Sequence, residues 1–329
     1  MSQILLDVRN IKKLFPVKEN GLFHEQKYVH AVDDVSFAIR EGETLGLVGE
    51  SGCGKSTTGR VILNLIRPDS GDVLFEGESI YHHGARERND LRKKMQLVFQ
   101  DPFASLNPKK KIHEIVEEPL RFHGFTSKHE RKELAEEMLS MVGVDLQMGQ
   151  RYPHELSGGQ QQRVGIARAL VLKPKFVVCD EAVSALDVSI RAQVLNLLER
   201  LKDELNLSYL FISHDLSVVR HVSDRVCVMY LGKVVEMADY KEIFEHPAHP
   251  YTASLIQSIP IPDPSYKRKR MLLPGDIPSP VNPPPGCRFR SRCYMADNEC
   301  DGAEPSLEEI GKDHYVACVK CKNRSVVNS

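Results

Sequence analysis

The stretch GESGCGKST (49–57) has residue types that together can hold phosphate groups. It fits the pattern G-x-x-x-x-G-K-S/T, in which glycines let the backbone wrap so that successive N–H groups point inward. Lys55 can reach the β- and γ-phosphates of a nucleoside triphosphate, and the Ser56 hydroxyl can ligate Mg²⁺. Cys53 is expected to contribute its backbone N–H and not its thiol. The predicted phosphate-binding residues are Gly49, Glu50, Ser51, Gly52, Cys53, Gly54, Lys55, Ser56 and Thr57.

A second set of chemical groups lies at the end of FVVCDE (176–181). An apolar strand that ends in Asp180 places a carboxylate near the metal, as a Walker B motif does. Glu181 follows directly, where a carboxylate can polarise an attacking water molecule. Taken alone, the pattern is more simply interpreted as two solvated acids after a core strand. The phosphate-binding pattern in the same chain favours a catalytic pair.

These motifs require particular elements around them. TLGLVG (44–49) is typical of a buried strand that ends at glycine, and KSTTGRVILNLI (55–66) has apolar residues at helical spacing. Apolar strands that alternate with helices predict an α/β fold with a largely parallel sheet covered on both faces. Further strands are predicted at 5–8, 35–39, 95–99, 176–180, 209–213 and 225–230, and helical sequence at 101–165 and 188–205. One helix is expected to end near Gly143 and to bury a face made of Leu134, Met138, Leu139 and Val142.

LSGGQQQR (156–163) resembles the signature motif of ABC-transporter ATPases, and the other motifs of that family appear in order. Gln100 resembles the Q-loop glutamine, Asp187 the D-loop aspartate and His214 the switch histidine. The resemblance implies an ABC-type P-loop NTPase core with an inserted helical subdomain, and ATP and Mg²⁺ as its ligands. It implies catalytic roles for Glu181, His214, Gln100 and Lys55, and Mg²⁺ binding by Ser56, Gln100 and Asp180.

The signature residues Ser157, Gly158, Gly159 and Gln160 contain no strong acid or base. They precede or begin a helix expected at about 158–171, whose N-terminus can bind an anion. The resemblance implies that they contact ATP held by a second subunit, in a head-to-tail dimer with two composite sites. It also implies an aromatic side chain stacked on adenine, with Phe15 as the first candidate and Tyr28 as the second. Either aromatic could instead be a core residue.

Four longer stretches resemble the oligopeptide/dipeptide importer branch, namely DPFASLNP (101–108), RYPHELSGGQQQRVGIARAL (151–170), SALDVSIRAQVLNLL (184–198) and HPAHPYTASLIQSIP (246–260). Within that branch the chain is most similar to the F-type ATPase subunit, which pairs with a D-type ATPase. The resemblance covers nearly the whole chain. It implies peptide uptake with two transmembrane permease subunits and an extracellular binding protein, from the cytoplasmic face of the membrane. Ala182 departs from the branch, where proline is commoner after the catalytic glutamate.

Two other functions remain open at this stage. Members of the same branch take up nickel or other small solutes, so an importer of another substrate is one alternative. A soluble ABC ATPase that acts on DNA or ribosomes is an alternative of another class. The segment between the phosphate loop and the signature is too short for the long coiled coil of DNA-repair relatives. Relatives that act in translation carry two ATPase cassettes in one chain, whereas this chain has one.

The domain organisation is expected to be an ABC ATPase domain at 1–258, with its helical subdomain at about 101–165, and an extension at 259–329. The extension begins with a proline-rich linker and continues with GC-x-F-x-x-RC, a motif that recurs in this branch. The resemblance identifies Cys287, Cys293, Cys300 and Cys318 as the branch's four cysteines and implies a 4Fe-4S cluster. Zinc accepts the same thiolates, and an unmetallated or oxidised module is the third alternative.

Cys321 forms a C-x-x-C pair with Cys318 and adds an ambiguous fifth ligand. The extension has little apolar sequence, which predicts a poor core that metal binding would stabilise. Clustered cysteines in a reducing compartment favour a metal site over disulfides.

Charge and hydropathy limit the partners. The net charge of −1 provides no global attraction for nucleic acid or an anionic membrane, and no nucleic-acid partner is predicted. The basic run at 267–270 is interpreted as a solvated linker. No stretch approaches the roughly 18 apolar residues of a membrane helix, and no signal-peptide pattern is present at the N-terminus. These features predict a cytosolic chain that reaches the membrane through partners.

Overall fold

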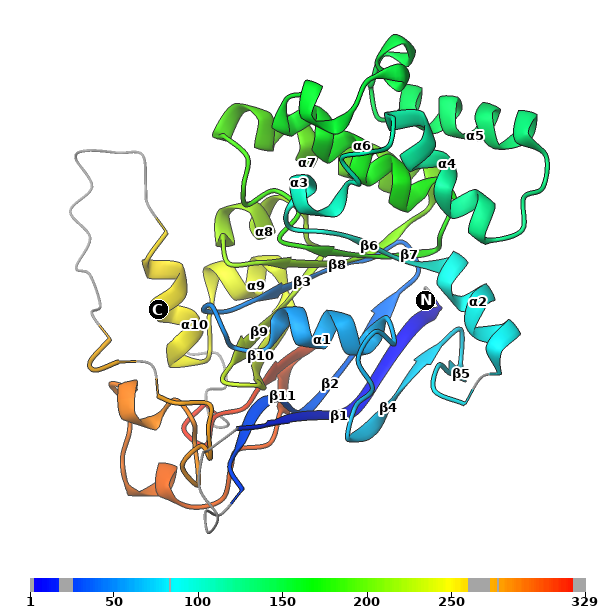
Figure 1. The fold of residues 1–329 in the computed structure, drawn as a ribbon. Coiled ribbons are helices and arrows are strands. Elements are labelled where there is room, and N and C mark those ends of the chain that lie inside the picture. The colour runs from blue at the N-terminus through cyan, green and yellow to red at the C-terminus, as the bar shows by residue number, and fades with distance from the viewer. Residues whose placement is uncertain (1–2, 18–25, 83, 260–272, 277, 322–329) are drawn as a thin grey trace, which may run out of the picture. The chain divides into compact units, whose positions relative to one another are not determined.

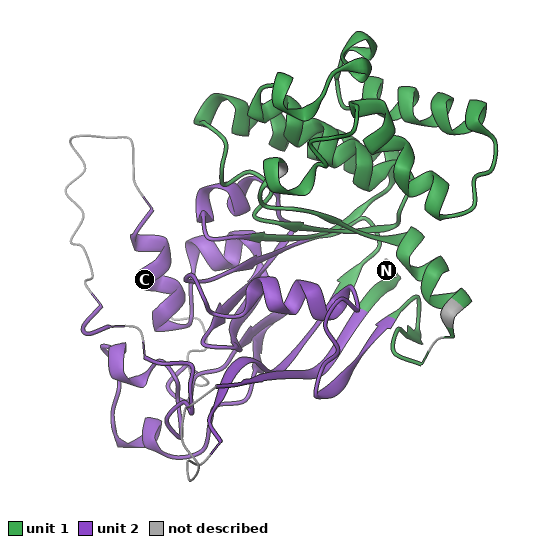
Figure 2. Cartoon of the chain, in the orientation of Figure 1, with its two compact units in different colours: residues 1–6, 39–44, 75–212 green, residues 7–38, 45–74, 213–329 purple. Residues whose placement is uncertain are grey.

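The structure, a computed structural model, describes residues 3–17, 26–82, 84–259, 273–276 and 278–321. The chain divides into two compact units, which Figure 2 shows in different colours. Unit 1 is made of residues 1–6, 39–44 and 75–212, and unit 2 of residues 7–38, 45–74 and 213–329. The basic run at 267–270 and much of the predicted proline-rich linker lie outside the described residues.

Unit 1 contains three neighbouring parallel strands, β6 (Met95–Val98), β7 (Phe176–Asp180) and β8 (Ser208–Ser213). Val98 pairs with Cys179, which pairs in turn with Phe211. Every residue of β7 is buried, as expected for an apolar strand covered on both faces. The strands predicted from these three runs are confirmed.

Most of unit 1 is helical, and Figure 1 shows α4 to α7 gathered on one face of β6, β7 and β8. The helical predictions for 101–165 and 188–205 are confirmed, whereas a separate inserted subdomain stays a prediction. The remaining elements of this part of the chain are β5 (Glu78–Ser79), α2 (Ala85–Lys94), α3 (Pro102–Ser105), α4 (Ile112–Phe122), α5 (Lys128–Met141), η1 (Leu146–Gln150), η2 (Pro153–Glu155), α6 (Gly158–Leu170) and α7 (Val188–Leu205).

Helix α5 follows its sequence pattern. Its predicted face packs inward, since Met138, Leu139 and Val142 are all buried. Ser127 caps its N-terminus by accepting a hydrogen bond from the Glu130 N–H at 3.3 Å. Gly143 follows the helix with a φ of 72°, in the left-handed region that ends many helices.

Unit 2 is built on two groups of strands. In one, the order is β2-β1-β4, formed by β1 (Ile4–Pro16), β2 (Tyr28–Arg40) and β4 (Ser70–Phe75). In the other, β3 (Thr44–Val48) is parallel to β9 (Arg225–Tyr230), which is antiparallel to β10 (Lys233–Asp239). The helices are α1 (Lys55–Ile62), α8 (Leu216–Val222), α9 (Tyr240–Glu245), α10 (Pro250–Gln257), η3 (Arg290–Arg292) and η4 (Asn298–Asp301).

The expectation of a largely parallel sheet is wrong at β10. Leu231 and Gly232 join β9 to β10 with φ values of 43° and 81°, the left-handed pair that closes a two-residue antiparallel hairpin. A parallel partner would have needed a long crossover connection. Helix α1 also differs, because it ends at Ile62 and not at position 66, and Asn64 beyond it is left-handed (φ 52°).

Residues 286–321, called here the C-terminal module, pack into unit 2. Strand β12 (His314–Val316) pairs antiparallel with β10 and with β11 (Glu308–Gly311). The sequence analysis predicted neither β11 nor β12. Phe289 and Val316 are fully buried, so the module contributes to a core instead of lacking one. Before the module, the Pro280 carbonyl accepts a hydrogen bond from the His30 N–H of β2 at 2.9 Å. This part of the predicted linker is therefore paired with a strand.

Candidate functional site

The predicted phosphate loop lies in unit 2, between β3 and α1. Two of its glycines are required by space. A Cβ added at Gly54 would lie 2.0 Å from the Ala31 carbonyl oxygen, and one at Gly49 would lie 2.2 Å from the Met229 carbonyl oxygen. Gly54 also has a φ of 107°, which L-residues rarely adopt. The loop is thus packed closely against neighbouring backbone.

Lys55 is buried within this loop. Its Nζ donates hydrogen bonds to the carbonyl oxygens of Gly49 at 2.7 Å and Glu50 at 3.0 Å. Gly54 begins α1 without a side-chain cap, so no capping side chain covers the anion-attracting end of the helix. Burial raises the pKa of the Cys53 thiol, which keeps it neutral. Lys55 Nζ also lies 3.8 Å from the Cys53 Sγ, and the backbone role expected for Cys53 stays a prediction.

The two acids predicted at the end of β7 lie in unit 1. Asp180 is the last, buried residue of the strand, and Glu181 follows with a left-handed φ of 48°. The Glu181 carboxylate accepts a hydrogen bond from Gln100 Nε2 at 2.9 Å. Its backbone N–H donates to Ile212 of β8 at 3.0 Å, which helps to hold the uncommon backbone conformation. The structure therefore brings together the Q-loop glutamine and the predicted general base.

The signature residues at the start of α6 also lie in unit 1. Ser157 and Gln160 form a capping box, in which each side chain accepts the backbone N–H of the other at 3.3 and 3.0 Å. A Cβ at Gly159 would lie 2.5 Å from Cγ2 of Ile190 on α7, so only glycine lets these helices approach. Asp187 caps α7 by accepting the Ile190 N–H at 2.9 Å. These residues have structural roles that the sequence analysis missed, although S-x-x-Q is itself a capping signal.

The remaining ATP-site candidates lie in unit 2. His214 follows β8 and is exposed, next to Asp215, which caps α8 by accepting the Ser217 N–H at 2.9 Å. Phe15 and Tyr28 are both partly exposed, at 37% and 39%. Phe15 has the Lys13 ammonium 5.6 Å from its ring centroid. The assignment of the adenine-stacking residue stays a prediction, with Phe15 first.

The four cysteines of the C-terminal module influence one another electrostatically. Burial raises the pKa of the Cys287 thiol to about 11, and the nearby thiols of Cys318, Cys300 and Cys293 contribute to this rise. Among the described residues, however, no group of three or more histidine, cysteine or acidic side chains is arranged to hold a metal ion. The 4Fe-4S or zinc prediction is therefore not confirmed. Cys321 is fully buried, and its thiol donates to the Ala248 carbonyl at 3.1 Å, as a core residue does.

One contact of the phosphate loop was not predicted. The Glu50 carboxylate pairs with Arg292 of the C-terminal module, with Nη1 2.8 Å from Oε2. The Glu50 N–H donates to the Tyr251 hydroxyl at 2.9 Å. The only available signal was the arginine of GC-x-F-x-x-RC, which has no evident use in binding metal.

Membrane-spanning character is absent from the described helices, since none combines sufficient length with sufficient apolar content.

Two protein families match the chain. The family described as "ABC transporter" matches residues 32–184. The family described as "Oligopeptide/dipeptide transporter, C-terminal region" matches residues 235–300. The first range contains the phosphate loop, the signature and the acid pair, and the second includes three of the four module cysteines.

Similar proteins of known name match over nearly their full length. The oligopeptide transport ATP-binding protein AppF of Bacillus subtilis is 52% identical over 320 residues, which cover 96% of this chain and 97% of AppF. The oligopeptide transport ATP-binding protein OppF of Escherichia coli is 49% identical, covering 97% of this chain and 96% of OppF. The dipeptide transport ATP-binding protein DppF of the same organism is 48% identical, covering 97% and 95%.

Solved structures share the fold of most of the chain. The cbiO1 protein of Clostridium perfringens, part of the ABC transporter complex cbiONQ, superposes with a TM-score of 0.64 at 27% identity. It covers 74% of this chain and 92% of its own. A dimeric ATP-binding cassette in a post-hydrolysis state, bound to ADP and Pi, has a TM-score of 0.62 at 31% identity and covers 72% and 99%.

Proposed function

The chain belongs to the ABC transporter family, in the oligopeptide/dipeptide branch, and from this membership we propose that it is the ATP-hydrolysing subunit of a peptide importer. In this role it couples ATP binding and hydrolysis to the uptake of oligopeptides or dipeptides. The observation that carries the proposal is identity near one half to peptide-transport ATP-binding proteins, over nearly the whole of both chains. That identity extends through the C-terminal region, beyond the ATPase core that many transporters share.

The chemistry assigned to the chain is hydrolysis of ATP to ADP and phosphate, with Mg²⁺ neutralising charge on the phosphate oxygens. Lys55 exchanges the carbonyls of its own loop for the β- and γ-phosphate oxygens. The residues proposed to hold Mg²⁺ are Ser56, Asp180 and Gln100. Glu181 accepts a proton from the attacking water, and its contact with Gln100 supports the pairing of these roles. His214 is assigned to the γ-phosphate and Phe15 to the adenine.

The proposed working assembly is a head-to-tail pair of ATPase subunits. Ser157, Gly158, Gly159 and Gln160 of each subunit bind ATP held by the other, and a D-type ATPase is the proposed partner. The capping box of α6 supports this role, because it fixes a helix N-terminus that can face an anion. Two permease subunits, reached from the cytoplasmic face of the membrane, and an extracellular binding protein complete the importer.

The proposed domains are an ATPase domain at 1–258, with a helical subdomain at about 101–165, and an extension at 259–329.

We also propose that Cys287, Cys293, Cys300 and Cys318 bind a 4Fe-4S cluster, with zinc as the alternative. The support is chemical: after burial, the nearby thiols of Cys300 and Cys318 raise the pKa of both Cys287 and Cys293, and thiolates are the ligands that both centres use. Because β12 of the module pairs with β10, the module is already held in unit 2 by strand pairing, and a metal is not its only source of stability.

Metal analysis tests the cysteine proposal. The full chain, purified without oxygen, is expected to contain about four iron and four acid-labile sulfide per chain and to lose both in Cys293→Ser. Cys321→Ser is the matched control, since a serine hydroxyl can still donate to the Ala248 carbonyl, and it is expected to keep the metal. Stoichiometric zinc without iron identifies the alternative centre. A chain that contains neither iron nor zinc would contradict the proposal.

Membrane association tests the transporter proposal. The tagged chain, expressed at its natural level, is expected to sediment with membranes and to co-purify with two permease subunits and a second ATPase. Deleting the permease genes is expected to release it from membranes and to stop uptake of labelled di- and oligopeptides. Recovery with ribosomes or DNA, independent of the permeases, would overturn the proposal. Uptake of nickel without peptide uptake would replace the substrate and keep the ATPase role.

A further inference from the structure

Besides its glycine and its two cysteines, the motif GC-x-F-x-x-RC contains a phenylalanine and an arginine, which have no role in the ATPase motifs or in metal binding. Phe289 is 1% exposed, and the Arg292 side chain is 9% exposed. Both point away from solvent into the part of unit 2 that contains the phosphate loop. Their burial and their partners indicate a function for the C-terminal module that concerns nucleotide.

Phe289 packs into an aromatic cluster behind the loop. Its ring centroid lies 5.2 Å from that of Tyr230 at the end of β9, and 5.3 Å from that of Tyr251 on α10. Tyr230 and Tyr251 are themselves 4.7 Å apart. Aromatic rings at these separations attract one another beyond their area burial, so Phe289 helps to fix Tyr251. The Tyr251 hydroxyl in turn accepts the Glu50 N–H at 2.9 Å.

Arg292 holds the same loop residue by its side chain. Its Nη1 donates to Oε1 of Glu50 at 3.1 Å and to Oε2 at 2.8 Å. The Glu50 side chain is only 23% exposed, so the pair is mostly withdrawn from water and interacts more strongly than a surface ion pair. The Glu50 carbonyl accepts from Lys55 Nζ at 3.0 Å and from the Cys53 N–H at 3.3 Å. Every polar part of Glu50 is therefore bound.

A second route from the module reaches the loop through the β9–β10 turn. Arg288 is 7% exposed, forms an ion pair with Asp33 and donates to the Leu231 carbonyl at 2.5 Å. Burial alone would raise the pKa of Asp33, but hydrogen bonds from His30 and Arg288 hold it well below its usual range. Gly232, which follows Leu231 in the β9–β10 turn, donates its N–H to the Cys53 carbonyl of the phosphate loop at 2.9 Å.

We propose that Arg292 is a positioning residue of the nucleotide site, and that docking of the C-terminal module thereby sets the chain's affinity for ATP. This inference rests on the proposed ATPase function. The guanidinium keeps the Glu50 carboxylate turned toward the module and neutralised, at the first variable position of the phosphate loop. Without it, an unpaired carboxylate remains beside the site of a polyphosphate, and like charges repel across the poorly solvated loop.

Removing the charge of Arg292 is expected to weaken nucleotide binding only while Glu50 keeps its own charge. Arg292→Gln keeps a polar side chain of moderate length but removes the charge, and is expected to raise Kd and KM for Mg·ATP roughly tenfold, within the range of coupled charge pairs. The kcat value is expected to change less than about twofold, because Arg292 does not touch the reacting groups. Arg292→Lys retains the charge and is expected to restore most of the affinity. In a Glu50→Gln background, Arg292→Gln is expected to have little further effect.

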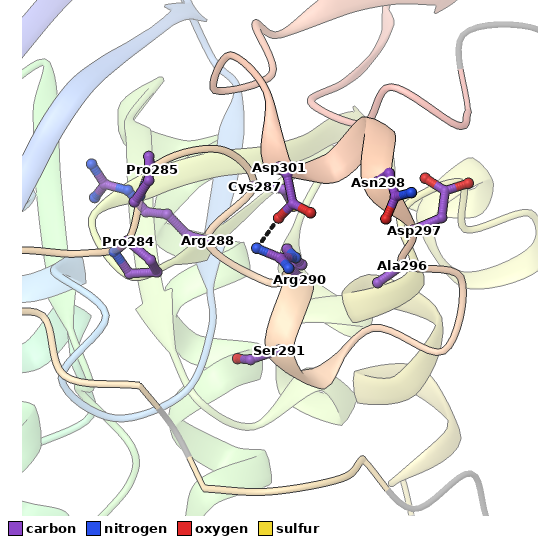
Figure 3. Close-up of a pocket in the computed structure, with 10 residues that line it drawn as sticks. All are labelled: Pro284, Pro285, Cys287, Arg288, Arg290, Ser291, Ala296, Asp297, Asn298 and Asp301. Carbon is purple, nitrogen blue, oxygen red and sulfur yellow. Dashed lines mark ion pairs between the residues drawn. The ribbon is translucent and has the colours of Figure 1, made fainter.

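Arg290→Gln is the matched control. Arg290 belongs to the same short helix η3, but its guanidinium pairs with Asp301 inside the module, as Figure 3 shows. Arg290 and Asp301 line a cleft of the module, and Glu50 is not among the residues that line it. This control is expected to keep the Kd of the unmodified chain while removing one arginine charge from the same helix.

The experiment measures Mg·ATP binding by titration and ATPase kinetics on the full chain and these variants, with thermal unfolding as a folding check. Equal loss of affinity from Arg292→Gln with and without Glu50→Gln would reduce Arg292 to a general structural role and overturn the proposal. Unchanged affinity in Arg292→Gln would also overturn it. If Arg292→Gln unfolds, Arg292→Met, which removes the charge but keeps an apolar side chain in the buried position, is compared in the two Glu50 backgrounds with the same expected outcomes. Failure of the unsubstituted chain to bind ATP would instead contradict the proposed function.

Discussion

Replacing Glu181 with glutamine is expected to slow steady-state ATP hydrolysis sharply while ATP still binds, so that the variant accumulates as an ATP-bound dimer. The amide has nearly the shape of the carboxylate but cannot accept a proton from water. General-base catalysis contributes typically 10²- to 10⁴-fold, so kcat is expected to fall by about that factor. Phosphate release measures the rate, and size-exclusion chromatography with and without Mg·ATP measures the dimer.

The position of Glu181 makes this variant informative. The Glu181 N–H donates to the Ile212 carbonyl at 3.0 Å, and glutamine keeps this backbone contact at the same φ of 48°, so the substitution is expected to leave the fold intact. Glu204→Gln on α7 is the matched control, because this acid is 47% exposed and its side chain pairs only weakly with Arg200. Unchanged turnover in Glu181→Gln would remove Glu181 from the role of base.

Replacing Lys55 with methionine is expected to weaken ATP binding strongly. The ammonium is buried, and its two carbonyl partners belong to the loop that receives the phosphates. Truncating one partner of a buried charged contact costs about 2–5 kcal/mol, which corresponds to a loss of affinity of roughly 30- to 5,000-fold. Thermal unfolding provides the readout, because a ligand that binds only the folded chain raises Tm.

The same substitution also changes the nucleotide-free chain. Without Lys55 Nζ, the carbonyls of Gly49 and Glu50 lose a donor, so Tm without ATP is expected to fall by a few degrees. The exposed Lys241 on α9 offers a control, and Lys241→Met is expected to keep both the initial Tm and its rise with Mg·ATP. A normal ATP-dependent rise in Lys55→Met would contradict the assignment of Lys55 to the phosphates.

The phosphate loop and the Walker B strand could be predicted because their information is local. Gly54 must be glycine for reasons of backbone conformation, Lys55 reaches carbonyls five and six residues away, and β7 is a continuous apolar run. Such features depend on neighbours in sequence, which a motif contains in full. The capping box of Ser157 and Gln160 is equally local, since the spacing S-x-x-Q is itself a capping signal.

The family, the ATP chemistry and most strands and helices follow from contiguous patterns of apolar, glycine and charged residues. The docking of the C-terminal module through β12 and the contact of Arg292 with Glu50, across 242 positions of chain, depend instead on the folded structure. Which arginine finds which carboxylate depends on where the β9–β10 hairpin and α10 direct the chain. That choice is made by packing over the whole unit, and no short stretch of sequence contains it.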